Sequence, residues 1–278
     1  MIKDALKLKC CERTILAALH RHGIYFRPMR QKPVLTSKDK KERLTFGLTD
    51  RSKPASFWTS TVHAYIDNKF FTTYLTPKAR AFARKMKPRG TFRMRGQGLD
   101  SAHVKPRKDQ KVNFGKKVQV AVAISASKVI MCHMVVGKWC GEKAATMYSS
   151  ALSPSLKRAY PTKRRFFLLE DNDPTGYKSD LGRAAKRSSH IEILQIPPRS
   201  PDLNPLDFSF WAEVNTRMRK QEARFSSDYV EPRAVFVDRL RRTILGVPAS
   251  KLVHMVGSMK RRCKQVVDAE GGHFEEGS

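Results

Sequence analysis

The sequence predicts an α/β fold in which a mixed sheet is flanked by helices. Two short apolar runs, Phe166 to Leu169 and Ile191 to Ile196, have the pattern of buried strands. A helical pattern from Asp180 to Ser189 separates them, and the order strand, helix, strand indicates a parallel crossover. Two further strand-like runs, Lys116 to Ser125 and Lys128 to Val136, are joined by two residues and predict a hairpin.

The remaining elements complete this fold class. Thr61 to Asp67 alternates as a strand that ends in an acid, and Ala144 to Arg158 reads as a helix. The last third of the chain has helical patterns over Phe208–Met218, Val235–Leu245 and Ala249–Val267, and its acidic, glycine-rich end from Asp268 is expected to be frayed.

The composition points to a polyanionic partner. In 278 residues, 55 lysines and arginines face 25 acids, a formal net charge of +30. Charge alone leaves DNA, RNA, an anionic membrane surface and a ribosome-like role open, with nucleic acid favoured. No apolar run approaches the roughly 18 residues of a membrane span, and no signal peptide is evident, so a soluble, intracellular protein is expected. The five cysteines and eight histidines lack metal-site spacing, which argues against a His/Cys metal site.

The N-terminal segment has the pattern of two short helices between Ile2 and Ile24. The second, Glu12 to Arg21, carries Ile15, Leu16 and Leu19 at helical spacing. Its outer face would present small and basic side chains to DNA, as a recognition helix does. These are Arg13, Thr14, His20 and Arg21. An ordinary amphipathic helix pair is the alternative, and this segment taken alone favours that alternative.

We expect three regions along the chain. Residues 1–35 form a partial helix-turn-helix DNA-binding segment. Phe26 to Lys41 is a basic connector that runs from this region into the next and reads as a linker. Residues 36–56 form a linker and a connecting helix, opened by the capping-box pattern Thr36-Ser37-Lys38-Asp39 and expected to end near Phe46. Residues 57–278 form the main domain with its C-terminal helices.

A basic segment follows the first strand of the main domain. Thr76-Pro77 is a good helix start, and no acid occurs between Lys69 and Leu99. Phosphate binding is therefore a better interpretation of this segment than an ordinary solvated face. The expected DNA-binding side chains are Arg80, Arg84, Lys85, Lys87, Arg89, Arg93 and Arg95.

Three acids are placed where elements end or begin. Asp67 and Asp171 follow apolar runs, and Asp207 lies in the first turn of a helix. Clustered carboxylates in a cationic chain suggest a divalent metal bound by oxygen, which suits Mg²⁺ or Mn²⁺. Two such ions about 4 Å apart could support phosphoryl displacement on a nucleic acid.

Neighbouring polar residues are expected to be structural. Strand alternation turns Glu170 to the opposite face from Asp171. Asp173 and Asp202 lie in proline-containing turns, where short acids commonly cap backbone amides. Asn172 is expected to support the ligands without binding the metal itself. Trp211 is expected to pack in the core and fix its helix.

These residues carry a resemblance to a known family. Asp171-Asn172-Asp173-Pro174, followed by Ser200-Pro201-Asp202-Leu203-Asn204-Pro205-Leu206-Asp207 and Trp211, resembles the catalytic core of mariner-like transposases. Asp171 and Asp207 are separated by 35 residues, within the usual spacing of that family. The resemblance implies a ribonuclease-H-like fold and a DDE/D triad. Asp67, Asp171 and Asp207 would then be the catalytic metal ligands, the third being Asp as in the mariner branch.

The resemblance also implies a function. It implies a DNA transposase that cleaves strands with Mg²⁺ or Mn²⁺, two ions being expected, and transfers the freed 3′-OH to target DNA. The partners would be double-stranded transposon ends and target DNA, bound by a homodimer, with no membrane and no small-molecule substrate. The location would be nuclear in a eukaryote and otherwise intracellular on DNA.

The chain departs from the family pattern in two places. Gly176-Tyr177 stands where relatives commonly have a histidine, and the paired helix-turn-helix arm is present only in part. Three alternatives therefore stay open: a transposase-derived DNA-binding protein without catalytic activity, a generic ribonuclease-H-like nuclease, and, last, a basic RNA-binding structural protein.

Overall fold

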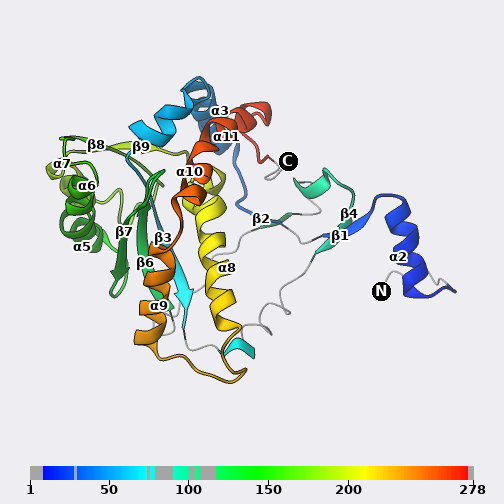
Figure 1. Ribbon diagram of the computed structural model, residues 1–278. Helices are drawn as coiled ribbons and strands as arrows, with labels where there is room; N and C mark the ends of the chain where they lie inside the picture. The colour runs from blue at the N-terminus through cyan, green and yellow to red at the C-terminus, as the bar shows by residue number, and fades with distance from the viewer. Residues whose placement is uncertain are drawn as a thin grey trace. The chain divides into compact units, whose positions relative to one another are not determined.

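The computed structural model describes residues 9–27, 30–73, 76–78, 90–99, 104–106 and 117–274 (Figure 1). The chain divides into two compact units. One comprises residues 1–34, 81–109 and 273–278, and the other comprises residues 35–80 and 110–272. The candidate acids all belong to the second unit.

The second unit is organised around a mixed sheet with the strand order β7-β6-β3-β8-β9. β3 pairs in parallel with β8, and β8 with β9, whereas β6 runs antiparallel to both β3 and β7. The predicted hairpin and the predicted parallel crossover are both confirmed. The strands are β3 (Ala64–Thr72), β6 (Lys117–Ile124), β7 (Val129–Val135), β8 (Phe166–Glu170) and β9 (Ile191–Gln195).

Helices cover both faces of this sheet, and Figure 1 shows α5, α6 and α7 on one side and α8 and α9 on the other. The first set is α5 (Gly141–Thr146), a π-helical segment (Met147–Leu152), α6 (Ser153–Ala159) and α7 (Asp180–Ser188). The second set is a π-helical segment (Leu206–Phe210), α8 (Trp211–Glu222), α9 (Arg233–Leu245), α10 (Ala249–Gly257) and α11 (Met259–Asp268). The predicted helix over Ala249–Val267 is thus two helices, which meet at Ser258.

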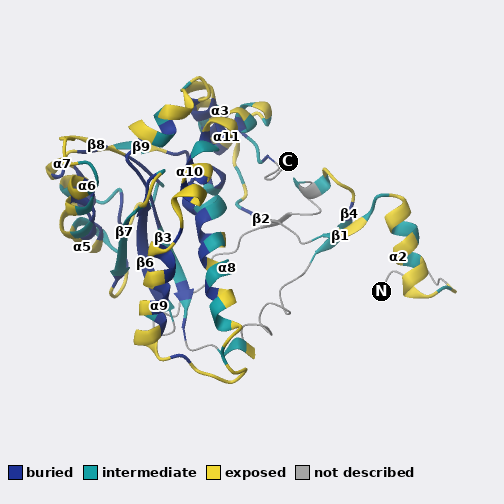
Figure 2. Cartoon of the chain, in the orientation of Figure 1, coloured by how far each residue is buried: buried dark blue, intermediate teal, exposed yellow. Residues whose placement is uncertain are grey.

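Strand alternation decides which side chains enter the core. Ala64, Ile66 and Leu168 pack with Met147 and Leu152 from the helical segment on their face, and all five are buried. The burial view shows these central strands dark against the yellow outer faces of the helices (Figure 2). Fully burying a side chain such as Leu contributes about 1.5–3 kcal/mol. This layer therefore holds β3 and β8 side by side, which positions the acids.

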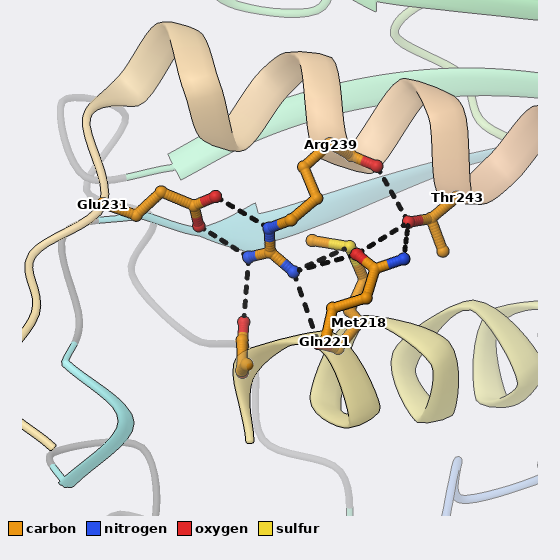
Figure 3. Close-up of polar contacts among 6 residues, drawn as sticks. Met218, Gln221, Glu231, Arg239 and Thr243 are labelled. Carbon is orange, nitrogen blue, oxygen red and sulfur yellow. Dashed lines mark hydrogen bonds and ion pairs between the residues drawn. The ribbon is translucent and has the colours of Figure 1, made fainter. Parts of the chain in front are cut away.

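A buried arginine connects the C-terminal helices. Arg239 of α9 donates to both carboxylate oxygens of Glu231, at 2.7 and 2.6 Å, and to Glu222 of α8 at 3.2 Å. Figure 3 shows the guanidinium among these acids and beside Gln221 and the carbonyl and sulfur of Met218. The buried guanidinium is therefore paired with acids from both sides, and this network ties α9 to α8.

The connecting helix is longer than its sequence pattern predicts. α3 spans Ser37–Asp50, and the predicted capping box is present because Thr36 and Asp39 each accept from the backbone of the other. Residues 35–56 belong to the same compact unit as the sheet. A π-helical turn (Phe57–Thr61) follows, so this part of the chain is helical and packed against α11. The three-region division expected from the sequence stays a prediction.

The first unit contains short elements. α2 (Glu12–Arg21) is the predicted second helix, and the predicted first helix lies outside the described residues. β1 (Tyr25–Arg27) pairs with β4 (Thr91–Arg93), and β2 (Arg30–Lys32) pairs with β5 (Val104–Pro106), with a 3-10 turn at Gln97–Leu99. The segment expected to begin a linker therefore contributes strands. Within the described ranges, no helix is long and apolar enough for a membrane span.

Candidate active site

The first two acids lie on neighbouring strands. β3 pairs with β8 at Ala64↔Leu168 and Tyr65↔Leu169, and the same register continued by two residues brings Asp67 opposite Asp171. Neighbouring strands lie about 4.8 Å apart. Alternation turns Asp67 and Asp171 to the same face of the sheet, the face covered by α8. The structure therefore brings these two predicted residues together.

Asp67 is not at the end of its strand, which corrects one prediction. β3 continues to Thr72, and Asp67 pairs with Val122 of β6 in the middle of that ladder. From Asn68 to Thr72 the backbone of β3 stays paired with β6, beyond the last residue pair with β8. Asp67 thus occupies the point where the sheet loses one neighbour, which leaves room for Asp171.

Asp207 reaches the same site from a helix start, as predicted. It lies in the π-helical segment Leu206–Phe210, and its backbone N–H donates to the carbonyl of Asn204 at 3.0 Å. Its charge contributes to raising the pKa values of Asp67 and Asp171. The three acids therefore form one electrostatic cluster.

The cluster resists ionisation in the protein alone. Burial first, and then the charges of Asp207 and Asp171, raise the pKa of Asp67 well above its usual value. Burial also dominates at Asp171, where Asp173 and Asp207 add to the shift and the pKa rises to about 6. Carboxylates that repel one another in a partly dry site favour either a proton or a bound cation.

Two residues that orient the acids are not apparent from the sequence pattern. Trp211 is buried, as expected, but its Nε1 also donates to Oδ2 of Asp67 at 2.6 Å. Asn204, fully buried, donates from Nδ2 to the carbonyl of Ile66 at 3.4 Å and accepts from the backbone N–H of Leu206. Asn before Pro is a common turn signal. That signal marks Asn204 as a turn residue, but it does not reveal the partner on β3.

Asn172 follows Asp171 in the chain and bonds to the end of β9, while its expected supporting role at the acids stays a prediction. Its Nδ2 donates to the carbonyl of Ile196 at 2.5 Å, and its Oδ1 accepts from Nε2 of Gln195. The side chain therefore ties the loop after β8 to the end of β9, which fixes the path of the backbone next to Asp171.

The acids near the site have structural partners, as predicted. Glu170 faces away from Asp171 and contacts Lys186 and Tyr148. Asp173 accepts from the backbone N–H groups of Thr175 and Gly176 at 3.1 and 2.9 Å. Asp202 forms a buried ion pair with Arg43, a partner that the turn pattern does not indicate.

Arg43 of α3 uses every donor of its guanidinium. Nη1 and Nη2 each lie 2.7 Å from an oxygen of Asp202, Nη1 also donates to Ser200, and the remaining donors reach the carbonyls of Gly271 and Gly272. Five N–H groups thus meet five acceptors. The pair anchors the loop that leads to Asp207, and it shows that the tail is ordered to at least Gly272, where fraying was expected.

The departure at Gly176-Tyr177 has a local structural reason. A Cβ at position 176 would lie 2.0 Å from Nε1 of Trp139, the atom that donates to Asp173 at 2.6 Å. Tyr177 is buried and packs edge-on against Trp139 at 5.4 Å between ring centroids. Tight packing against Trp139 therefore fills the position where the family commonly has a histidine.

The donor chemistry of the cluster fits a hard divalent cation, since its groups are carboxylate oxygens and the pKa values of Asp67 and Asp171 are raised. Among the residues described, however, no three acidic, histidine or cysteine side chains come close enough together to hold one metal ion. The side chain of Asp67 is held in one orientation, because Nε1 of Trp211 donates to its Oδ2.

The expected DNA-binding residues divide into three groups. Arg13, Thr14, His20 and Arg21 are exposed on α2, none of whose residues is buried. Arg95 is exposed, but Arg93 is buried in β4, so the prediction that it extends an outer basic face is wrong. The remaining members lie outside the described residues: Arg80, Arg84, Lys85, Lys87 and Arg89.

The fold and the position of the acids define a ribonuclease-H-like domain, as the sequence predicts. Among solved structures, the Mos1 mariner paired-end complex with Mn superposes with a TM-score of 0.69 at 18% identity, covering 98% of this chain and 75% of that one. The catalytic domain of Mos1 mariner transposase gives 0.61 at 17% identity, covering 88% of this chain and 99% of that one.

Sequence comparisons find similarity to proteins named transposases. The Tcb2 transposase of Caenorhabditis briggsae is 31% identical over 108 residues, which are 39% of this chain and 36% of that protein. The Tc3 transposase of Caenorhabditis elegans is 24% identical over 276 residues, covering 97% of this chain and 74% of its relative. The match to Tcb2 thus spans little more than a third of that relative, and no protein-family model matches the chain. The predicted similarity to mariner-like transposases is confirmed.

Proposed function

We propose that this chain is a DNA transposase that cleaves DNA strands and joins the freed 3′-OH to a target. The observation that carries the proposal is the placement of Asp67 opposite Asp171 on neighbouring strands, with Asp207 close enough to raise the pKa of both. The relatives bear the name transposase, and the structural neighbours include a strand transfer complex of Mos1.

Asp67, Asp171 and Asp207 would hold Mg²⁺ or Mn²⁺, and two ions would fit the proposed reaction. Bound metal supplies activation of the attacking hydroxyl and stabilisation of the leaving oxygen. The chain itself orients the ligands: Trp211 holds one oxygen of Asp67, and the backbone N–H of Asp173 donates to Oδ1 of Asp171 at 3.2 Å. Neighbouring Mos1 structures contain Mg or Mn, which supports this choice of ion.

The proposed partner is double-stranded DNA, both the ends of an element and its target. The net charge of +30 supports binding to a polyanion. A homodimer on paired ends is proposed because similar structures are described as paired-end complexes. Action on nuclear DNA, in a eukaryotic host, belongs to the same proposal.

The test is an assay for cleavage and strand transfer with Mg²⁺ or Mn²⁺. The unmodified chain is expected to nick DNA and to produce joined products, whereas Asp171→Asn and Asp207→Asn are expected to remove both activities. Asp238→Asn is the matched control, because Asp238 is a largely exposed acid paired with its helix neighbour Arg242.

Three results would count against this proposal. Full activity in Asp207→Asn would contradict the triad. Nicking that never yields joined products would favour a generic nuclease. DNA binding that is indifferent to metal and to these substitutions, without cleavage, would favour the non-catalytic alternative.

A further inference from the structure

Two cavities lie next to each other at the end of β9, the edge strand of the sheet. The larger, of about 850 Å³, lies between α3 and the end of β9 and includes Asn172 in its wall. The smaller, of about 440 Å³, lies between α7 and β9. Lys178 and Gln195 line both cavities, so the two adjoin at these side chains.

Both cavities carry an excess of positive charge. Lys38, Lys41 and Lys178 line the larger cavity, where the single acid Glu42 lies 3.8 Å from Lys38. The smaller is lined by Lys178, Arg183, Lys186 and Arg187, and its single acid, Glu170, is paired with Lys186. The lining acids are therefore already neutralised. Arg183 is paired with Asp180, which leaves the excess charge on Lys41, Lys178 and Arg187.

Lys178 connects these cavities to the acid cluster. Its charge is near enough to Asp171 to oppose the rise in the pKa of that carboxyl. Asn172, the residue after Asp171, lines the larger cavity. If one phosphate of a nucleic-acid strand lies at the acids, the next phosphates of that strand would therefore lie near Lys178.

Recognition in the cavities would be independent of base sequence. Lysine and arginine on phosphate oxygens fix the position of a duplex and carry no sequence information. The lining combines these charges and the amides of Asn172 and Gln195 with apolar side chains, among them Phe46, Ile191, Ile193 and Ile196. The excess of lysine and arginine favours a nucleic-acid backbone over an apolar ligand. It also favours a backbone over a small acidic metabolite, which would need an enclosing set of donors.

We propose that the two cavities form a phosphate track, in which Lys41, Lys178 and Arg187 hold the backbone of the DNA strand beyond the phosphate at the acids. The track rests on the proposed function, and it adds a DNA contact that is separate from α2 and from the basic segment after Thr76. Its role is to hold the strand in place without reading its sequence.

The experiment measures how DNA affinity depends on salt. A fluorescein-labelled duplex of arbitrary sequence is titrated with the full chain in EDTA, and log affinity is plotted against log salt. The test variant carries Lys41→Gln, Lys178→Gln and Arg187→Gln. The control variant carries Lys128→Gln, Lys157→Gln and Arg158→Gln, which remove the same charge from exposed positions near the opposite end of the sheet.

Each lost phosphate contact lowers the salt slope by about 0.9. The test variant is therefore expected to lose about 2 to 3 from the slope, and the control to keep the slope of the unmodified chain. Equal slopes for the two variants, with unchanged circular dichroism, would overturn the track.

Failure of the track and failure of the proposed function give different results. The binding assay needs neither metal nor cleavage. If the unmodified chain cleaves DNA but both variants have equal salt slopes, the track alone is rejected. An unmodified chain that binds DNA, with the expected loss of slope but no cleavage, rejects the catalytic role and retains the track.

Discussion

Replacing Arg43 by Met is expected to destabilise the protein by about 3–5 kcal/mol, because it leaves the buried carboxylate of Asp202 without its counterion. Both side chains are almost completely buried, at 0% and 1% exposure. The substitution also removes the hydrogen bonds that Arg43 donates to Ser200 and to the carbonyls of Gly271 and Gly272. Urea denaturation of the purified chain measures the change in the free energy of unfolding.

Two further variants make this result specific to the ion pair. Arg51→Met removes an exposed arginine just after the same helix and is expected to change stability by less than about 0.5 kcal/mol. The double variant Arg43→Met with Asp202→Leu is expected to be more stable than Arg43→Met alone, since it removes the unpaired charge. An Arg43→Met protein as stable as Arg51→Met would contradict a structural role for the pair.

Asp171→Asn is expected to stabilise the metal-free protein at pH 8, by up to about 3 kcal/mol. The pKa of Asp171 is about 6 in the folded protein, against a usual value of 3.8. Between these values the folded state binds more protons than the unfolded state, so the contribution of Asp171 to stability falls as the pH rises from about 4 to about 6. An asparagine cannot ionise, so its advantage is small at pH 4 and complete above pH 6.

Asp173 provides a control of opposite sign two residues away. Burial alone would raise its pKa, but hydrogen bonds from Thr175, Trp139 and the backbone lower the pKa below its usual value. Its contribution to stability is therefore present at neutral pH and lost as the pH falls, so Asp173→Asn is expected to destabilise at pH 8. Thermal unfolding in EDTA measures both variants. A destabilised Asp171→Asn protein at pH 8 would contradict the charge repulsion.

The part of the site that follows local patterns was predictable from the sequence. The apolar runs before Asp171 and the helical pattern after Asp207 depend on neighbours a few residues away. The face of Glu170 follows from strand alternation in the same way. The fold class, the crossover and the positions of these two acids could therefore be predicted from the sequence.

The contacts that assemble the site join residues far apart in the sequence. Trp211 and Asp67 are separated by 144 residues, and Arg43 and Asp202 by 159. Nothing in the local pattern around Trp211 indicates a partner for its Nε1, and Asp202 in a turn has the signature of an amide cap. The prediction that Asp67 ends its strand was wrong for a similar reason. Asn68 and Lys69 are polar, as residues after a strand often are, but their backbone continues to pair with β6.

Binding of Mn²⁺ is the most direct test of the claim that Asp67, Asp171 and Asp207 form one metal site. The free ion is followed by electron paramagnetic resonance during titration of the unmodified chain and of the three single Asp→Asn variants. Each variant is expected to bind at least about 100-fold more weakly, since even residues that only support ligands cost about 10- to 100-fold. Asp238→Asn, which changes a largely exposed acid on α9, is expected to keep the original affinity. Equal Mn²⁺ binding by the unmodified chain and all three variants would contradict the account.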